Sequence, residues 1–369
     1  MAVDVETFHP QYESFVGAKP QTVQSCGTEE IQDQQVDIVD IRAGGKPLDL
    51  KQSIRRSLRE LNEDGLRSLP SLLLWNEQGL RHFEQVTYTP EYYLTNTEIS
   101  LLEQHSIQIA HSIEPGTILL ELGSGCLRKI NILLQAIDAL GKQADYYALD
   151  LDLRELARTL KELNPSRFKH VSCHGLLGTY DDGKAWLSQE INAVRPKCLL
   201  SLGSTMGSFT RGEAGDFLQQ WTRVLRQGGD TRRQEQPDAK IIIGLDGCKN
   251  EKQVYSAYND RAGVNRCFIL NVIENANSHL GYNAFNQKDW SVKGEWDADS
   301  GRHAQYLTPL KDLSFEELII RRGEKILVVY SYKNDERDKN QLWARSQLKE
   351  IARYMSRDGS YGMLRVYFQ

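Results

Sequence analysis

Short apolar runs alternate with amphipathic segments through the middle of the chain, and this alternation restricts the possible folds more than any other feature. Five runs have the character of buried strands, and they lie at Gly116–Gly125, Ala144–Asp152, Phe168–Gly175, Lys197–Thr205 and Ala239–Cys248. Segments with apolar residues at helical spacing separate most of them. Strands that alternate with helices form a parallel sheet with helices on both faces. We therefore predict an α/β fold.

The alternation stops at Lys249 and resumes with a strand at Glu324–Lys333. The residues between are rich in Asn, Tyr and Trp, which indicates an insertion or a second lobe. We predict five segments: an N-terminal tail (1–35), an early part of the lobe (36–95), the sheet domain (96–248), a lobe insertion (249–333) and a C-terminal helix and strand that complete the sheet domain (334–369). Within them we expect a strand at Val36–Arg42 and helices at Asn96–Ser112 and Gln341–Met355.

Composition argues against several classes of protein. A net charge of −5 over 369 residues provides no basic footprint for nucleic acid. No apolar run approaches the length of a membrane span, and the polar segment from Met1 to Lys19 lacks the apolar core of a secretory signal. The six cysteines form no CxxC pair and the histidines show no metal spacing, so we expect free thiols and no metal site. A cytoplasmic enzyme with a small-molecule substrate fits this balance; the oligomeric state is not indicated.

A glycine-rich turn follows the first strand of the predicted sheet. Glu121, Gly123 and Gly125 form a Glu-x-Gly-x-Gly pattern, and glycine lets backbone approach a ligand closely. In open α/β sheets the ligand lies beyond the carboxyl ends of the strands. This form of the turn is common in S-adenosylmethionine-dependent methyltransferases. A dinucleotide fingerprint would need another glycine where Arg128 stands; an ordinary strand-to-helix turn is the alternative interpretation.

The turns after the later strands strengthen the case for a nucleoside ligand. Asp150 ends the second strand, where an acid can accept both ribose hydroxyls, although an acid there can also cap a helix, as Asp152 could. Tyr180 follows the third strand and could stack on adenine or belong to a plain turn. The segment Gly203–Phe209 follows the fourth strand, where a methyl acceptor should meet the sulfonium. Methyl transfer to nitrogen needs alignment rather than a metal or a covalent nucleophile.

Eight motifs occur in an order that resembles the histidine Nα-methyltransferase family of ergothioneine biosynthesis. The resemblance is strongest to its fungal branch, which includes the 4-dimethylallyltryptophan N-methyltransferases. It spans about Val36 to Lys333, through LLLWNEQGLRHFEQVT, PEYYLTNTE, LELGSGCLRK, YYALDLD, GLLGTYDDG, GSTMGSF, AYNDRAGV and SYK. It implies a Rossmann-like methyltransferase sheet that uses S-adenosylmethionine, with a second α+β lobe that binds an amino-acid substrate.

The resemblance also assigns residues to the site. It implies cofactor contacts at Gly123, Ser124, Lys129, Asp150, Thr179 and Tyr180, and the turns after the first and fourth strands add Glu121, Gly125, Gly203 and Ser204 to the cofactor residues that we expect. The substrate residues are Trp75, Tyr93 (or Tyr92), Ser208 and Tyr258 at the amino-acid head group, with Val329 and Ser331 at its side chain. Tyr92, Tyr93 and Ser208 lie nearest to the expected chemistry.

Three departures from the histidine-specific pattern bear on the acceptor. Ser208 stands where those members place Asn, Val329 where they place Glu, and Trp75 where they place Tyr. Valine cannot accept a bond from an imidazole N–H, and a buried N–H left unpaired costs about 1–3 kcal/mol. We therefore expect methylation of the α-amino group of tryptophan, a prenylated tryptophan, tyrosine or a derivative. The alternatives are histidine itself, another amine or phenol, and a protein that binds S-adenosylmethionine without turnover.

Overall fold

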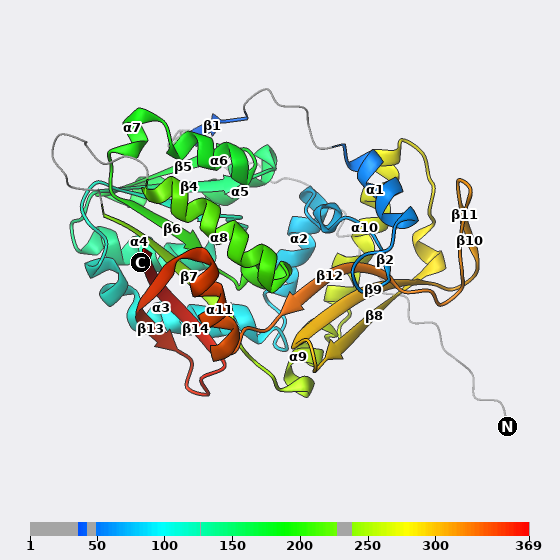
Figure 1. Cartoon of the computed structure of the whole chain (residues 1–369). Helices are drawn as coiled ribbons and strands as arrows, with labels where there is room; N and C mark the ends of the chain where they lie inside the picture. Colours follow the sequence, from blue (N-terminus) through cyan, green and yellow to red (C-terminus); the bar gives the residue numbers. More distant parts are fainter. Residues whose placement is uncertain (1–35, 43–48, 126, 227–237, 369) are drawn as a thin grey trace, which may run out of the picture. The chain divides into compact units, whose positions relative to one another are not determined.

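The computed structural model describes residues 36–42, 49–125, 127–226 and 238–368. The predicted tail at 1–35 lies outside these residues. The described residues from Val36 onward belong to one compact unit. Their strands form a larger sheet, a smaller sheet and a two-stranded hairpin, and Figure 1 shows helices packed against the larger and the smaller sheet.

The larger sheet contains the five strands predicted between Gly116 and Cys248, whereas the strand predicted at Glu324–Lys333 lies in the smaller sheet as β12 (Ile326–Tyr332). Within the described residues the larger sheet has eight strands, in the order β1 (Ile38–Asp40), β5 (Val171–Leu177), β4 (Ala144–Asp150), β3 (Thr117–Leu122), β6 (Lys197–Ser201), β7 (Ala239–Asp246), β14 (Tyr361–Phe368) and β13 (Leu348–Met355). All pairs from β1 to β7 are parallel, whereas β14 is antiparallel to β7 and to β13. The order reverses between β3 and β6, and ligands of open α/β sheets bind at such a point. The predicted Rossmann-like α/β fold is confirmed.

Helices cover both faces of this sheet because alternate strand residues point to opposite sides. On one face, Leu119 of β3 belongs to a hydrophobic cluster that includes residues of α3 (Tyr93–His111), α4 (Arg128–Ala139) and α5 (Leu153–Leu163). On the other face, Ile118 and Leu120 of β3 belong to a second cluster, with residues of α6 (Tyr180–Leu187), α8 (Arg211–Arg226) and α11 (Glu336–Ser346). Short helical segments η2 (Pro165–Arg167), α7 (Glu190–Ala193) and η3 (Thr205–Ser208) lie in the connections.

A smaller sheet forms the second lobe, in the order β2 (Arg67–Ser68), β12 (Ile326–Tyr332), β9 (Arg302–Pro309) and β8 (Trp290–Asp297). The helical segments around it are α1 (Leu50–Arg59), η1 (Ser71–Leu74), α2 (Glu77–Val86), α9 (Glu251–Tyr258), α10 (Val264–Leu280) and η4 (Gln287–Asp289), and β10 (Leu313–Phe315) pairs with β11 (Leu318–Ile320) in a hairpin. The lobe thus combines residues that come before β3 with residues that come after β7 in the sequence.

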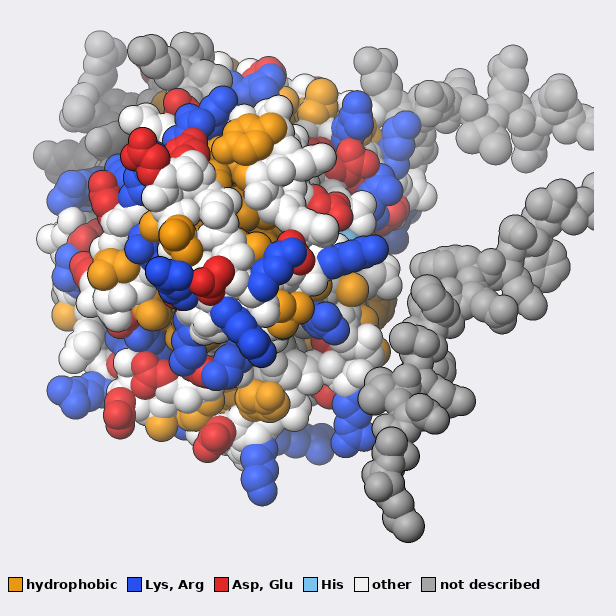
Figure 2. Space-filling model, turned by 90° about the vertical axis from the view of Figure 1, so that its right-hand side faces the viewer, with side chains coloured by type: hydrophobic (Ala, Val, Ile, Leu, Met, Phe, Trp, Pro, Cys, Tyr) orange, Lys and Arg blue, Asp and Glu red, His pale blue; other side chains and the backbone are white. Residues whose placement is uncertain are grey.

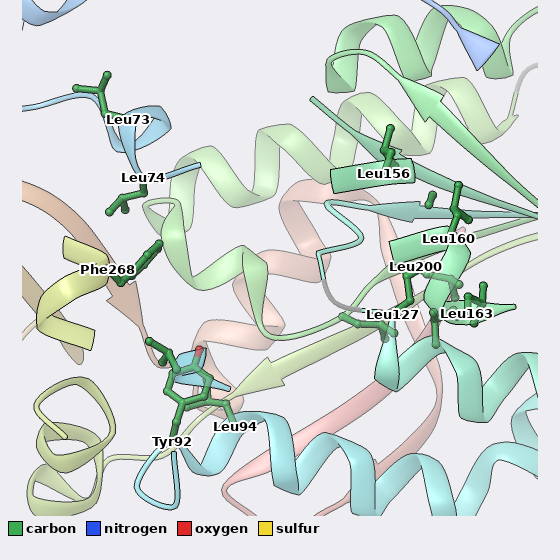
Figure 3. Packing of buried hydrophobic residues seen from close by; sticks show 14 of the residues in the cluster. Leu73, Leu74, Tyr92, Leu94, Leu127, Leu156, Leu160, Leu163, Leu200 and Phe268 are labelled. Atoms are coloured by element: carbon green, nitrogen blue, oxygen red, sulfur yellow. The ribbon is translucent and has the colours of Figure 1, made fainter. Parts of the chain in front are cut away.

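One hydrophobic cluster continues from the lobe into the larger sheet. Figure 3 shows Leu74 and Phe268 on the lobe side and Leu127 and Leu200 at the larger sheet, with Tyr92 between the lobe residues and α3. All five side chains are at least 94% buried. A continuous apolar core explains why both sheets belong to one compact unit.

Three expectations about secondary structure need correction. The predicted helix Gln341–Met355 ends at Ser346, where Gln347 adopts a left-handed φ of 57°, and the rest is strand β13. Apolar residues at helical spacing misled the prediction, because pairing with β14 overrides local preference. The strand within Val36–Arg42 exists as β1, but it pairs with β5 of the larger sheet, not with the lobe. The helix predicted to begin at Asn96 begins at Tyr93.

The outer face of the lobe carries charges of both signs. Figure 2 shows lysine and arginine side chains interspersed with acidic and apolar ones. Arg55 and Arg59 of α1 both pair with Glu316 in the β10–β11 turn, with N–O distances of 2.6 and 2.7 Å. These ion pairs attach the hairpin to α1. Among the described residues, none of the helices is both long and apolar enough to cross a membrane.

Candidate functional site

The glycine-rich turn after β3 has a backbone that requires glycine. Gly123 and Gly125 have φ values of 66° and 48°, a region that side chains with a Cβ rarely enter. A Cβ on Gly123 would lie 3.1 Å from the hydroxyl of Tyr180, which starts α6. The structure therefore brings the predicted residues from the first and third turns together, and, apart from Gly125 and its chain neighbours, no heavy atom of the described residues lies within 4 Å of the position that a Cβ on Gly125 would take.

Glu121 lies behind this turn and is only 3% exposed. Tyr146 of β4 donates a hydrogen bond to its carboxylate at 2.5 Å. Burial raises the pKa of Glu121 to about 7, because water no longer solvates the charge, although the Tyr146 bond and nearby Lys129 oppose the shift. The carboxyl group therefore changes its charge near neutral pH, directly beneath the turn.

Asp150 ends β4 beside the same turn. Its carboxylate accepts from the Leu151 N–H at 2.7 Å and, more distantly, from the Gly125 N–H at 3.4 Å, and burial raises its pKa. Asp152 caps α5 by accepting from Arg154 N–H and Glu155 N–H. The helix-capping role thus belongs to Asp152, and Asp150 keeps acceptor capacity at the turn. A glycine turn with an acid beside it fits the nucleoside part of S-adenosylmethionine.

A buried carboxylate that the sequence analysis missed organises the loop after β6. Glu98 of α3 is fully buried and accepts from the Gly203 N–H at 2.8 Å, from Lys129 at 2.8 Å and from the Tyr361 hydroxyl at 2.8 Å. Gly203 has a φ of 75°, and a Cβ there would lie 2.7 Å from the Lys129 ammonium. Two predicted cofactor residues thus meet at Glu98. Its position within PEYYLTNTE was the available signal.

Three of the predicted hydroxyl residues already have partners within the chain. Thr179 caps α6 in a capping box with Asp182. The Ser204 hydroxyl accepts from the Asp246 N–H at 3.0 Å, and Ser204 is itself in a left-handed conformation with φ 56°. Ser208 is exposed, and its hydroxyl donates to the Thr205 carbonyl at 2.8 Å. Thr179 and Ser204 therefore have structural roles, whereas exposed Ser208 can exchange its partner for a ligand.

Six aromatic rings form a continuous group, which we call the aromatic group: Trp75, Phe83, Tyr92, Tyr258, Phe268 and His303. They come from α2, α9, α10, β9 and the cap residues of η1 and α3. Ring centroids lie 5.3 Å apart for Trp75–Phe83, 6.0 Å for Phe83–Tyr92, 5.9 Å for Tyr92–Tyr258 and 4.7 Å for Tyr258–His303. Phe268 contacts both Trp75 and Phe83 at 5.3 Å. The structure thus brings together three predicted substrate residues, Trp75, Tyr92 and Tyr258, although Trp75 and Tyr258 are 183 positions apart in the sequence.

The remaining pair of predicted substrate residues lies on β12, next to this group. Val329 is paired with Gln305 and Ser331 with His303 across the antiparallel β9, so all four side chains share one face of the sheet. The Oε1 atom of Gln305 and the Nδ1 atom of His303 are buried without a hydrogen-bond partner. Burial lowers the pKa of His303 to about 3, so the ring is neutral.

A buried ion pair lies behind two of the predicted tyrosines. Asp246 ends β7 and Lys333 follows β12, and their charged atoms are 2.7 Å apart. The Tyr93 hydroxyl donates to Asp246 at 2.5 Å, and Lys333 donates to the Tyr258 hydroxyl at 2.9 Å. The acid at the end of a strand and the lysine of SYK were visible in the sequence, but nothing there indicated their pairing.

The site therefore combines two parts. The turn after β3, with Asp150 and Tyr180, offers glycine backbone and a carboxylate to a nucleoside. In the aromatic group, Tyr92, Phe268 and His303 are buried, whereas Trp75, Phe83 and Tyr258 are partly exposed. Beside this group, β12 contributes the side chains of Val329 and Ser331. Among the described ranges, no group of three or more His, Cys, Asp or Glu side chains could hold a metal ion.

Known proteins with similar sequences carry related descriptions. The family model "Histidine-specific methyltransferase, SAM-dependent" matches residues 50–367. Ergothioneine biosynthesis protein 1 of Neurospora crassa is 44% identical over 325 residues, which are 88% of this chain but only 36% of that protein. The chain thus matches about a third of the length of that relative.

Two shorter relatives are matched over most of their length. A 4-dimethylallyltryptophan N-methyltransferase of Aspergillus fumigatus is 31% identical over 87% of this chain and 94% of its own. A further N-methyltransferase of the same organism is 32% identical over 80% and 78%. Among solved structures, an S-adenosylmethionine-dependent methyltransferase from Bacteroides fragilis in complex with S-adenosyl-L-homocysteine has a TM-score of 0.35 at 13% identity, over 77% of this chain and 81% of that chain.

Proposed function

Because the chain belongs to the histidine-specific, S-adenosylmethionine-dependent methyltransferase family, we propose that it methylates the α-amino nitrogen of an amino acid with a planar aromatic side chain, of tryptophan or tyrosine type. The expected cofactor positions are the glycine turn after β3, Asp150 and Tyr180. The observation that carries the choice of acceptor is the aromatic group, with Val329 beside it. Ring surfaces of this kind favour a flat apolar side chain.

When bound, S-adenosylmethionine supplies a methyl group on a sulfonium centre: the amine lone pair forms the new N–C bond, the S–C electrons return to sulfur, and S-adenosylhomocysteine leaves. The work of the protein is to hold the amine unprotonated and in line. Tyr93 and Ser208 offer oxygen atoms for this purpose from the start of α3 and from η3. The proton that the nitrogen loses passes to solvent.

Histidine is a second candidate acceptor, and a specific observation favours it. The unpaired Gln305 Oε1 lies on the strand position opposite Val329, so an acceptor for an imidazole N–H exists although Val329 provides none. The similarity to the Neurospora crassa ergothioneine biosynthesis protein points the same way. The two candidate acceptors make different contacts with β9: the imidazole of histidine can donate a hydrogen bond to Gln305, whereas a tryptophan-type side chain packs its ring against the aromatic group.

Product masses decide between the candidates. The purified protein is incubated with S-adenosylmethionine and the twenty amino acids plus 4-dimethylallyltryptophan, one at a time. We expect a gain of one, two or three methyl masses on tryptophan, its prenylated form or tyrosine. Methylated histidine alone would contradict the tryptophan-type assignment, and its loss in Gln305→Leu would support the role of Gln305.

Two further outcomes are informative. Cofactor binding without methylation of any acceptor would support a non-catalytic protein that binds S-adenosylmethionine.

In Val329→Glu, a new carboxylate would face the substrate ring, and we expect histidine turnover to rise relative to tryptophan turnover. Val39→Glu, at an exposed position of β1, is a matched control that should leave the ratio unchanged.

A further inference from the structure

The strand β1 lies at the edge of the larger sheet and is only three residues long. It pairs in parallel with β5, and Figure 1 shows it beside that strand at the end of the sheet. The Gly175 N–H donates to the Asp37 carbonyl at 2.8 Å, and the Ile41 N–H donates to the Leu177 carbonyl at 3.1 Å. Because so short a strand makes few backbone hydrogen bonds, its side chains must help to hold it in place.

Two isoleucines fix β1 from opposite faces of the sheet. Ile38 packs against the hydrophobic cluster that contains α5, and Ile41 packs against the cluster that contains α6. Before the strand, the Asp37 carboxylate accepts from Nδ1 of His174 at 2.7 Å, and the His174 ring is stacked on Tyr147 with a centroid distance of 4.9 Å. The strand is therefore held on both faces and at its N-terminal end.

Two glycines leave room for these isoleucines. A Cβ on Gly175 would lie 3.0 Å from Cγ1 of Ile38, and a Cβ on Gly178 would lie 2.9 Å from Cγ1 of Ile41. Both distances are shorter than the optimal separation of two carbon atoms, about 3.5–4.0 Å. Neither glycine has a positive φ, so backbone conformation does not require glycine at these positions. The close approach of β1 does.

The contact at Ile41 leads to the expected cofactor position. Gly178 is followed by Thr179, which caps α6, and Tyr180 is the first residue of that helix. Ile41 and Tyr180 pack against the same hydrophobic cluster. The Tyr180 hydroxyl lies 3.1 Å from the position of a Cβ on Gly123, in the glycine turn after β3. Ile41 thus supports the segment that holds the Tyr180 ring beside this turn.

We propose that β1 supports the cofactor site, with Ile41 holding the turn at Gly178 so that the Tyr180 ring is placed for adenine. The inference rests on the proposed function, in which Tyr180 is a cofactor residue. Without the Ile41 side chain the turn loses its contact with β1, and the Tyr180 ring has more freedom. Cofactor affinity then falls, because the ring must be ordered when the nucleoside binds. Ile41 is thus a positioning residue that acts through Tyr180.

The test is a double-mutant cycle on Ile41 and Tyr180, with the dissociation constant of S-adenosylhomocysteine measured by calorimetry. The stacking of a base on an aromatic ring predicts that Tyr180→Ala weakens binding about tenfold. We expect Ile41→Ala to weaken binding about threefold to tenfold in the wild-type background, but less than about twofold in the Tyr180→Ala background, because residues that act as one unit are not additive.

A second ligand distinguishes support of the nucleoside position from a general distortion of the site. 5′-Methylthioadenosine contains the same nucleoside without the amino-acid part, so Ile41→Ala should weaken both ligands by the same factor. Ile41→Val keeps the Cγ atom that faces Gly178 and should restore wild-type affinity. Val39→Ala is a matched control, because Val39 lies on the same strand and is 40% exposed; it should leave both dissociation constants unchanged.

Gly178→Ala perturbs the same contact from the other side if Ile41→Ala does not fold, because the new Cβ must displace Ile41 or the turn. Wild-type affinity for S-adenosylhomocysteine in the folded variant would overturn the inference, as would equal losses in both backgrounds of the cycle. Equal affinity of the wild type and Tyr180→Ala would also overturn it. Failure of the proposed function is distinguishable, because it appears as the absence of methylated product while S-adenosylhomocysteine still binds.

Discussion

Replacing Glu121 with glutamine should remove a decrease in the free energy of unfolding that the wild-type protein undergoes as pH rises. The carboxyl group is buried, and its pKa rises from 4.5 to about 7 on folding. Between these values the folded state holds a proton that the unfolded state has released, so stability falls as pH rises. Since a tenfold difference in proton affinity is worth about 1.4 kcal/mol, the raised pKa of Glu121 lowers the free energy of unfolding by about 1.4 kcal/mol at pH 5.5 and by about 3 kcal/mol at pH 8.

Glutamine is neutral at both pH values, and its side-chain oxygen can still accept from Tyr146. The unfolding free energy of the wild-type protein should therefore fall by about 2 kcal/mol more than that of Glu121→Gln between pH 5.5 and pH 8. Urea unfolding followed by circular dichroism at several pH values measures both free energies, and contributions of the other carboxyl groups cancel in the difference.

Tyr146→Phe tests the direction of the effect of Glu121 on the pH dependence of stability. The Tyr146 bond lowers the pKa of Glu121, so its removal should make the loss of stability with pH larger than in the wild type. A difference between the wild type and Glu121→Gln that stays constant from pH 5.5 to pH 8, or that has the opposite sign, would refute the assignment of a raised pKa to Glu121.

Three further substitutions test the cofactor side of the site. Asp150→Ala should weaken S-adenosylmethionine binding at least tenfold in calorimetry, with an unchanged circular dichroism spectrum, because charge-assisted bonds to the ribose hydroxyls are lost. Gly203→Ala should lower the free energy of unfolding by about 1–2 kcal/mol, since its φ is 75° and the new Cβ would lie 2.7 Å from the Lys129 ammonium; urea unfolding measures this. Glu98→Ala should cost about 3 kcal/mol or more in the same assay, because it leaves the Lys129 ammonium and the Gly203 N–H without their acceptor.

Local periodicity was sufficient for β3 to β7, the five parallel strands at the centre of the larger sheet, because a buried parallel strand is a short apolar run that ends in a turn. The glycine turn and Asp150 were also visible, since they directly follow such runs. Periodicity failed at Leu348–Met355, where apolar residues at helical spacing form β13. It also could not show that β1 joins the larger sheet, because pairing partners are chosen by the whole fold.

The polar contacts of the site depended on tertiary structure. Glu98 binds the Gly203 N–H across 105 positions, and Lys333 binds Asp246 across 87. The sequence pattern around each of these residues does not distinguish it from its neighbours, so composition and spacing do not indicate its partner. The sequence alone determined the layered α/β core and the turns where a nucleoside could bind, because these follow from the spacing of apolar residues and glycines. Only the tertiary structure decided which buried charges meet, because that depends on the order of strands in the sheet and on the docking of the lobe against it.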